Sequence, residues 1–179
     1  MDKLEQIIFH NLKAVNGRTG MEYHMRLEAI FKDPLNFDLI MPLFDGCEDK
    51  NIVLIGSFGR HCIKLIDKYM LTVNGSIILF ENVKEQGTGR LKEEVFYPDF
   101  ISGDIVNKKF TMIDDIYYEN KIYDKVTNFL NKYSSHLENT RVIYDDCVNK
   151  INGVESEIRF HSSLLAAHAE DYGFVKSNN

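Results

Sequence analysis

The sequence predicts an α/β protein with a mostly parallel sheet flanked by helices. Asn51–Met70 and Lys109–Tyr133 each read as an apolar strand, a polar or glycine turn and an amphipathic helix, and Gly75–Phe80 is a further short apolar strand between them. Strands that alternate with helices are typical of parallel sheets. At 179 residues the chain is long enough for one domain. We expect an N-terminal part at about residues 1–45, a core at about 50–150 and a C-terminal segment at 151–179.

Composition excludes several classes of function. The formal charge of −6 and the absence of clustered Lys and Arg argue against general nucleic-acid binding. No stretch is apolar over the length of a membrane span, so we expect a cytoplasmic protein with no membrane contact. The three cysteines, Cys47, Cys62 and Cys147, form no C-x-x-C pair and predict buried thiols rather than disulfides or a zinc site.

The N-terminal part begins with Lys3–Leu12, which has the spacing of an amphipathic helix. Tyr23 lies in an alternating stretch that predicts a strand. Arg18 and Arg26 flank it as candidate anion contacts, or as ordinary surface arginines. Phe37–Phe44 is apolar enough for a core helix, which its proline must end or kink.

The clearest signal is the glycine turn between the strand at 52–55 and the following helix. Backbone N–H groups and the positive end of a helix receive phosphate at such a turn. The turn lacks both the full dinucleotide-binding fingerprint and the P-loop lysine. A plain sharp turn is the open alternative. The candidate ligand residues are Gly56, Ser57, Phe58, Gly59 and Arg60.

The polar stretch Glu81–Glu94 predicts a mobile surface loop, because it is glycine-interrupted and carries both charge signs. Lys84, Thr88 and Arg90 would stabilise charge on a departing phosphate if the loop closed over a ligand. An ordinary solvated hairpin is the alternative interpretation.

Two adjacent acids, Asp114 and Asp115, are predicted to end the strand that begins near Lys109. Ligands bind at the carboxyl ends of strands in open α/β sheets, and paired acids there face a cation, a hydroxylated ligand or water. A solvated loop with capping aspartates is the competing interpretation.

The remainder of the chain carries fewer signals. Arg141–Tyr144 predicts a short strand that ends at the next two aspartates, and the segment 151–179 has apolar residues at helical spacing before a polar tail. His161 and His168 lie seven residues apart but lack a third ligand, so a metal site is not favoured.

Several of these pieces, in this order, resemble the type I phosphoribosyltransferases, and most closely the orotate phosphoribosyltransferases. GRTGMEYHMRLEAIFKDP resembles the family's N-terminal hood, and IVLIGSFGRHCIKLI its pyrophosphate loop. KEQGTGR resembles the mobile catalytic loop, and FTMIDDI the start of the phosphoribosyl diphosphate motif. The resemblance runs from about Gly17 to Tyr133.

The resemblance implies a glycosyltransferase of nucleotide metabolism that moves ribose 5-phosphate from phosphoribosyl diphosphate to a nucleobase such as orotate. Asp114 and Asp115 would hold the ribose hydroxyls, and would meet magnesium indirectly through the ligand. Lys84 would neutralise the departing diphosphate within a homodimer. The mobile loop would add Gly87, Thr88, Gly89 and Arg90, the hood Arg18, Tyr23 and Arg26, and the 5-phosphate loop Glu119, Asn120 and Lys121.

The 5-phosphate loop departs from the family pattern, in which small residues and hydroxyls wrap the phosphate. Glu119 replaces a hydroxyl residue, Asn120 a glycine and Ile122 a second hydroxyl residue, with Lys121 as partial compensation. A carboxylate 4 Å from a phosphate costs about 1 to 4 kcal/mol. Basic residues that precede the loop lysine in orotate enzymes are also missing.

Two functions therefore stay open: an active transferase, and a degenerate member that binds a nucleotide-like ligand or a protein. A third class, nucleotidyltransferase, is suggested by Gly56 and Ser57 but lacks a metal-binding D-x-D at a useful distance.

Overall fold

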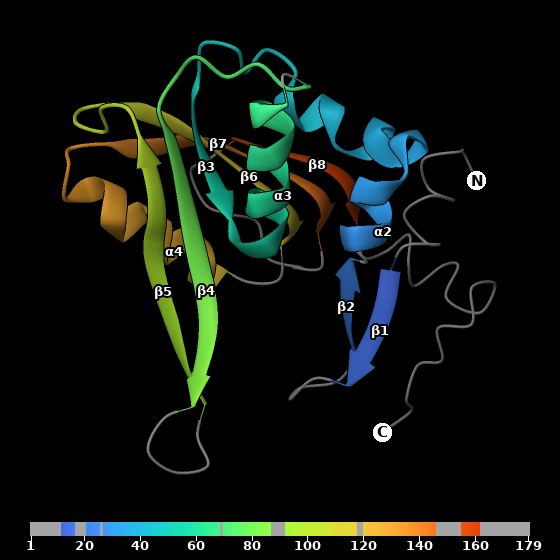
Figure 1. Ribbon diagram of the computed structural model, residues 1–179. Coiled ribbons are helices and arrows are strands. Elements are labelled where there is room, and N and C mark those ends of the chain that lie inside the picture. The colour runs from blue at the N-terminus through green and yellow to red at the C-terminus, as the bar shows by residue number, and fades with distance from the viewer. Residues whose placement is uncertain are drawn as a thin grey trace.

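The computed structural model describes residues 12–16, 21–25, 27–68, 70–86, 92–117, 120–145 and 155–161. Six strands form one sheet in the order β5-β4-β3-β6-β7-β8, and β1 and β2 form a separate antiparallel pair (Figure 1). Five strands of the large sheet are parallel, and β5 runs antiparallel to β4 at one edge. The sequence-based prediction of a mostly parallel α/β sheet is confirmed. The strands are β1 Leu12–Asn16, β2 Met21–Met25, β3 Asn51–Ile55, β4 Ile77–Gln86, β5 Lys92–Ser102, β6 Lys109–Tyr117, β7 His136–Asp145 and β8 Glu155–His161.

Helices cover both faces of the large sheet. Helix α3 (Gly56–Asp67) lies across one face, and α4 (Asn120–Asn131) lies on the other (Figure 1). Alternate residues of each strand supply the two cores. Leu54 and Ile113 pack with Phe58 under α3, whereas Phe80 and Phe110 pack with α4 residues such as Val126. Residues 52–55 of β3 and 77–80 of β4 are continuous apolar runs because both of their faces are buried.

Aromatic rings pack between α4 and the sheet. Phe80 stacks on Phe96 of β5 with ring centroids 4.7 Å apart, and it meets Phe129 of α4 edge-on at 5.0 Å. Lys125 lies 5.3 Å from the Phe96 ring centroid. These rings attach the antiparallel edge of the sheet to α4, with packing geometry that stabilises aromatic pairs beyond the area they bury.

For residues 81–94 the structure supports the alternative interpretation, an antiparallel hairpin, rather than a mobile surface loop. Residues 81–86 complete β4 and residues 92–94 begin β5, so this stretch forms an antiparallel hairpin that projects beyond the neighbouring strands (Figure 1). Composition suggested a loop because its charged residues suit water. An exposed hairpin tolerates the same residues, since its backbone groups pair across the two strands.

Other boundaries also differ from expectation. Two 3-10 helices, Pro34–Leu39 and Met41–Phe44, replace the predicted helix at 37–44, because Pro42 cannot continue it. A short helix, α2 (Leu27–Lys32), follows β2. Strand β8 was not predicted. The expected helix at residues 3–12 lies outside the described residues, except that Leu12 begins β1.

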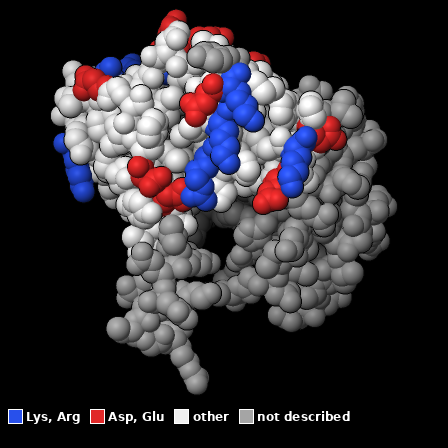
Figure 2. Space-filling model, in the orientation of Figure 1, with Lys and Arg blue, Asp and Glu red and all other residues white. Residues whose placement is uncertain are grey.

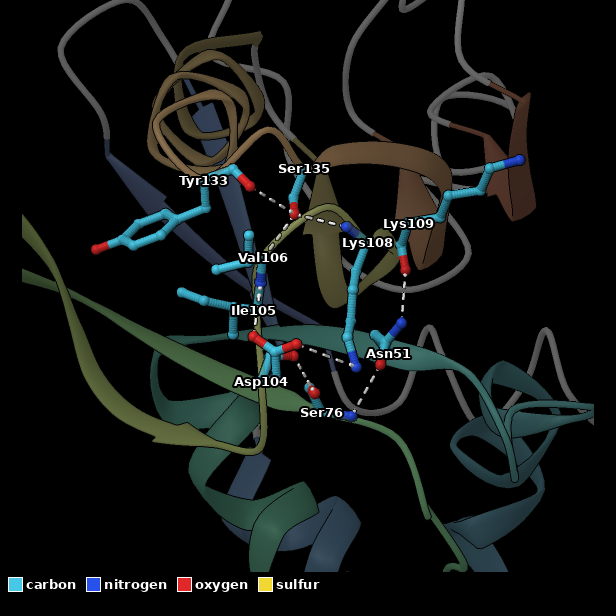
Figure 3. A network of polar contacts seen from close by, with 9 residues as sticks. All are labelled: Asn51, Ser76, Asp104, Ile105, Val106, Lys108, Lys109, Tyr133 and Ser135. Carbon is cyan, nitrogen blue, oxygen red and sulfur yellow. Dashed lines mark hydrogen bonds and ion pairs between the residues drawn. The ribbon is translucent and has the colours of Figure 1, made fainter.

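A polar network lies at the amino edge of the sheet, where β3, β4 and β6 begin (Figure 3). Ser135 donates its hydroxyl to the Ile105 carbonyl at 2.6 Å and accepts the Lys108 N–H at 2.8 Å. Asn51 accepts the Ser76 N–H at 2.9 Å and donates to the Lys109 carbonyl at 3.0 Å. These side chains satisfy backbone groups where the strands begin, which leaves the opposite edge as the open end of the sheet.

Within the ranges that the structure describes, no helix has the length and apolar character needed to cross a membrane.

Candidate active site at the carboxyl edge

Three parallel strands bring polar groups together at the carboxyl edge of the sheet. Leu54 of β3 pairs with Ile113 of β6, and Ile55 pairs with Phe80 of β4. Asp114 therefore lies level with Ile55 and Phe80, and the residues one step further, Gly56, Glu81 and Asp115, lie at the same level of three adjacent strands. This edge is where open α/β sheets bind ligands.

The paired acids lie within β6 rather than after it, since the strand continues to Tyr117. Asp115 donates its N–H to the Asp114 Oδ1 at 2.8 Å. Asp114 is buried, while Asp115 is partly exposed. The prediction that the acids end the strand is wrong by two residues, because the neighbouring strand β7 extends far enough to pair with Ile116 and Tyr117.

Burial sets the protonation of this pair. Burial raises the pKa of Asp114 well above its usual range, and the neighbouring Asp115 carboxyl raises it further by charge and by hydrogen bonding. The same acids act on Cys62 of α3, whose thiol pKa is raised well above its usual range by burial first and then by Asp115 and Asp114. The pair therefore joins a buried carboxyl with a raised pKa, Asp114, to a partly exposed carboxyl, Asp115.

This protonation predicts a pH dependence of stability. A carboxyl whose pKa is raised on folding holds a proton that the unfolded chain has released, so stability falls as pH rises from the unfolded pKa through the folded one. We expect Asp114→Asn to remove that loss and to raise the free energy of unfolding at pH 7 by about 1 to 3 kcal/mol. Urea unfolding at pH 4 and pH 7 checks this: the advantage of the variant should shrink at pH 4. An equal effect at both pH values would contradict it.

The predicted glycine turn is the first turn of helix α3. Gly56 already begins the helix, with φ at +54°, a conformation that favours glycine. Phe58 and Gly59 face the core rather than a ligand. A Cβ at Gly59 would lie 2.6 Å from Leu79 and 2.9 Å from Leu54, so this glycine lets the helix approach the strands closely.

Arg60 is engaged by a buried carboxylate. Its Nη1 donates to Glu81 Oε1, and its Nη2 donates to Ser57 Oγ at 3.0 Å. The Glu81 side chain is 7% exposed and the Arg60 side chain 50% exposed. Sequence reasoning assigned Ser57 and Arg60 to the site but missed Glu81, which was placed in a surface loop. The signal for it was a carboxylate directly after the apolar run 77–80.

The expected 5-phosphate loop is short. Only residues 118 and 119 separate β6 from α4, and Asn120 and Lys121 are the first two residues of the helix. Glu119 lies outside the described residues. Asn120 was predicted to occupy a loop, but the helix begins there.

The remaining predicted site residues are only partly described. Lys84 lies in β4 opposite Glu94, and Tyr23 lies in β2 opposite Ala14, but their side chains are outside the described part of the structure. Residues outside it altogether are Arg18, Arg26, Gly87, Thr88, Gly89 and Arg90. The structure thus brings together the acids, the start of α3 and Glu81.

The described carboxyl edge holds no cluster of side chains that could by themselves form a metal site. No group of three or more His, Cys, Asp or Glu side chains within the described ranges is arranged to hold a metal ion. Asp114, with its raised pKa, is also a poor ligand for a hard cation, which requires deprotonated oxygen.

Comparisons with solved structures identify the fold. Orotate phosphoribosyltransferase from Aeropyrum pernix superposes with a TM-score of 0.62 at 11% identity, covering 93% of this chain and 96% of that one. Adenine phosphoribosyltransferase from Thermoanaerobacter pseudethanolicus gives 0.59 at 10% identity, covering 89% and 99%. Orotate phosphoribosyltransferase from Francisella tularensis gives 0.54 at 15% identity, covering 94% and 91%.

The chain has the type I phosphoribosyltransferase fold. No protein-family model matches its sequence, and no curated protein sequence matches it either. At these identities the likeness shows the fold alone, so substrate and activity depend on the residues of this phosphoribosyltransferase-fold chain itself.

Proposed function

We propose that this protein transfers a ribose 5-phosphate group from phosphoribosyl diphosphate to a ring nitrogen of a nucleobase. The observation that carries the proposal is the acid pair of β6 at the carboxyl edge, next to the start of α3, in a fold shared with adenine and orotate phosphoribosyltransferases. In the reaction the nitrogen lone pair forms the bond to C1′, the C1′–O bond breaks, and diphosphate leaves with that electron pair.

The two acids have different parts in this proposal. Asp115, the partly exposed acid, accepts a hydrogen bond from a ribose hydroxyl, and a charged acceptor strengthens such a bond. Asp114, the buried acid, fixes the backbone of Asp115 through the 2.8 Å bond from the Asp115 N–H. Lys84, near the end of the β4–β5 hairpin, is assigned to the departing diphosphate.

Magnesium accompanies the ligand in this proposal, because proteins usually hold this ion through substrate phosphates and one or two carboxylates. Bound to the diphosphate oxygens, the ion would offset negative charge on the leaving group. No step is assigned to a protein-bound metal. The nucleobase is orotate or adenine, the two bases in the names of the structural neighbours, and a homodimer is the proposed assembly.

A second candidate function is ligand binding without transfer. The observation that favours it is the start of α4 at Asn120, which leaves residues 118 and 119 where related enzymes are expected to wrap a phosphate. The pairing of Arg60 with Glu81 also removes a cation from the ligand. Such a protein would bind the same ligand but turn nothing over.

Incubation with labelled phosphoribosyl diphosphate, magnesium and orotate or adenine separates the two functions. We expect a labelled nucleotide and stoichiometric diphosphate with one base. Binding of phosphoribosyl diphosphate, seen as a rise in melting temperature without product, would support the second function. If neither a labelled product nor a rise in melting temperature is seen, both proposed functions are overturned. Glu138→Gln, which removes an exposed charge near the start of β7, is a control that should leave either result unchanged.

A further inference from the structure

The ion pair between Arg60 and Glu81 is unequal in its access to water. Glu81 is held on β4 with its carboxylate almost fully buried, whereas half of the Arg60 side chain is exposed. Burying a carboxylate is costly unless it is paired, so the pair is the resting state of this edge. Arg60 is the partner that can turn toward a ligand, since its side chain already reaches solvent.

The pair also leaves little net positive charge at the start of α3. Figure 2 shows a stripe of basic side chains on this face with acidic side chains directly beside it. An anion that approaches Arg60 meets the field of Glu81 as well as that of the guanidinium. At about 4 Å each unit charge contributes on the order of 1 to 4 kcal/mol, so the two contributions nearly cancel.

We propose that Glu81 is an autoinhibitory residue that competes with a diphosphate group for Arg60. The inference rests on the proposed function in taking the ligand to carry diphosphate. In the resting state Glu81 Oε1 and Ser57 Oγ occupy both terminal nitrogens of Arg60. Diphosphate binds fully when Arg60 leaves Glu81, so the Glu81 carboxylate lowers the affinity of the protein for diphosphate.

Calorimetric titration with inorganic pyrophosphate tests the proposal. Glu81→Gln keeps a carbonyl oxygen to accept the Arg60 hydrogen bond but removes the negative charge. We expect it to bind pyrophosphate about tenfold more tightly than the wild type. R60Q/E81Q should lose that gain, which would place the effect at Arg60. Glu138→Gln, with the same change in net charge at a distant exposed residue, should stay within about twofold of the wild type.

The opposite model is that Glu81 orients Arg60 for the ligand. Unchanged or weaker binding of pyrophosphate by a folded Glu81→Gln variant would support that model and overturn autoinhibition. Autoinhibition would also be overturned if no variant bound pyrophosphate. If Glu81→Gln does not fold, the R60Q/E81Q variant tests the proposal instead. Affinity for pyrophosphate within about twofold of the wild type supports autoinhibition, and a tenfold loss of that affinity overturns it. Binding by Glu81→Gln with no transfer by the wild type would uphold autoinhibition while the proposed function fails.

Discussion

Arg141→Met is expected to lower the free energy of unfolding by about 2 to 5 kcal/mol. Arg141 lies on β7, is 7% exposed, and its Nη1 donates to the carbonyls of Leu43 at 3.0 Å and Asp45 at 2.7 Å. The same nitrogen lies 3.3 Å from Cys47 Sγ. Methionine fills much of the space but donates nothing, so both carbonyls lose a charged donor, and a hydrogen bond from a charged group contributes about 1.5 to 3 kcal/mol.

Urea unfolding at pH 7 measures this loss, with Lys132→Met as the matched control. Lys132 is exposed just after α4, so its replacement should change the free energy of unfolding by less than about 0.5 kcal/mol. A loss no larger for Arg141→Met than for Lys132→Met would show that the segment 41–47 is held on the sheet by its apolar residues alone.

The role of Arg141 was not predictable from its position in the sequence. It was read as part of a short strand, and the strand is indeed present, as β7. Its partners lie 94 to 98 residues away in the chain, and two of them are backbone carbonyls, which every residue carries. Local patterns therefore predict the strand but not the hydrogen bonds that attach it to the segment before β3.

The apolar central strands were predictable for a physical reason. Strand β3 is buried on both faces, and a continuous apolar run followed by a helical pattern is typical of such a strand. The edges behave differently. Strand β5 and the outer half of β4 are rich in charge, because one side of an edge strand meets water, and the same composition suits a loop.

The sequence predicted the edge of the sheet at which the candidate site lies, but not the boundaries of the elements that form it. Asp114, Asp115 and Arg60 lie at the predicted edge, but the local spacing of glycines and acids does not show where a strand ends and a helix begins. Helix α3 starts at Gly56 and α4 at Asn120, which converts two expected phosphate loops into first turns of helices. Glu81 was missed because its partner, Arg60, comes from another element.

Asp115→Asn is expected to lower kcat/KM for phosphoribosyl transfer about 100-fold, equivalent to about 2.7 kcal/mol. Asp115 is the partly exposed carboxylate of the pair, and the proposed function has it accept a ribose hydroxyl. An amide still accepts that hydrogen bond but without the charge that strengthens it. Its NH₂ group also directs a donor toward a site that needs only acceptors.

Asp114→Asn is the matched control for this prediction, because it removes a carboxyl from the adjacent residue of the same strand. The pKa of Asp114 is raised by burial and by Asp115, so asparagine imitates the protonated form that this shift favours and can still accept the Asp115 N–H. We therefore expect its kcat/KM to fall less than tenfold while its stability at pH 7 rises. Steady-state kinetics on both variants, each confirmed as folded by its unfolding curve, measures the difference. Equal losses in the two would show that both carboxyls contact the ligand as charged groups, and would mean that ligand binding draws the proton from Asp114.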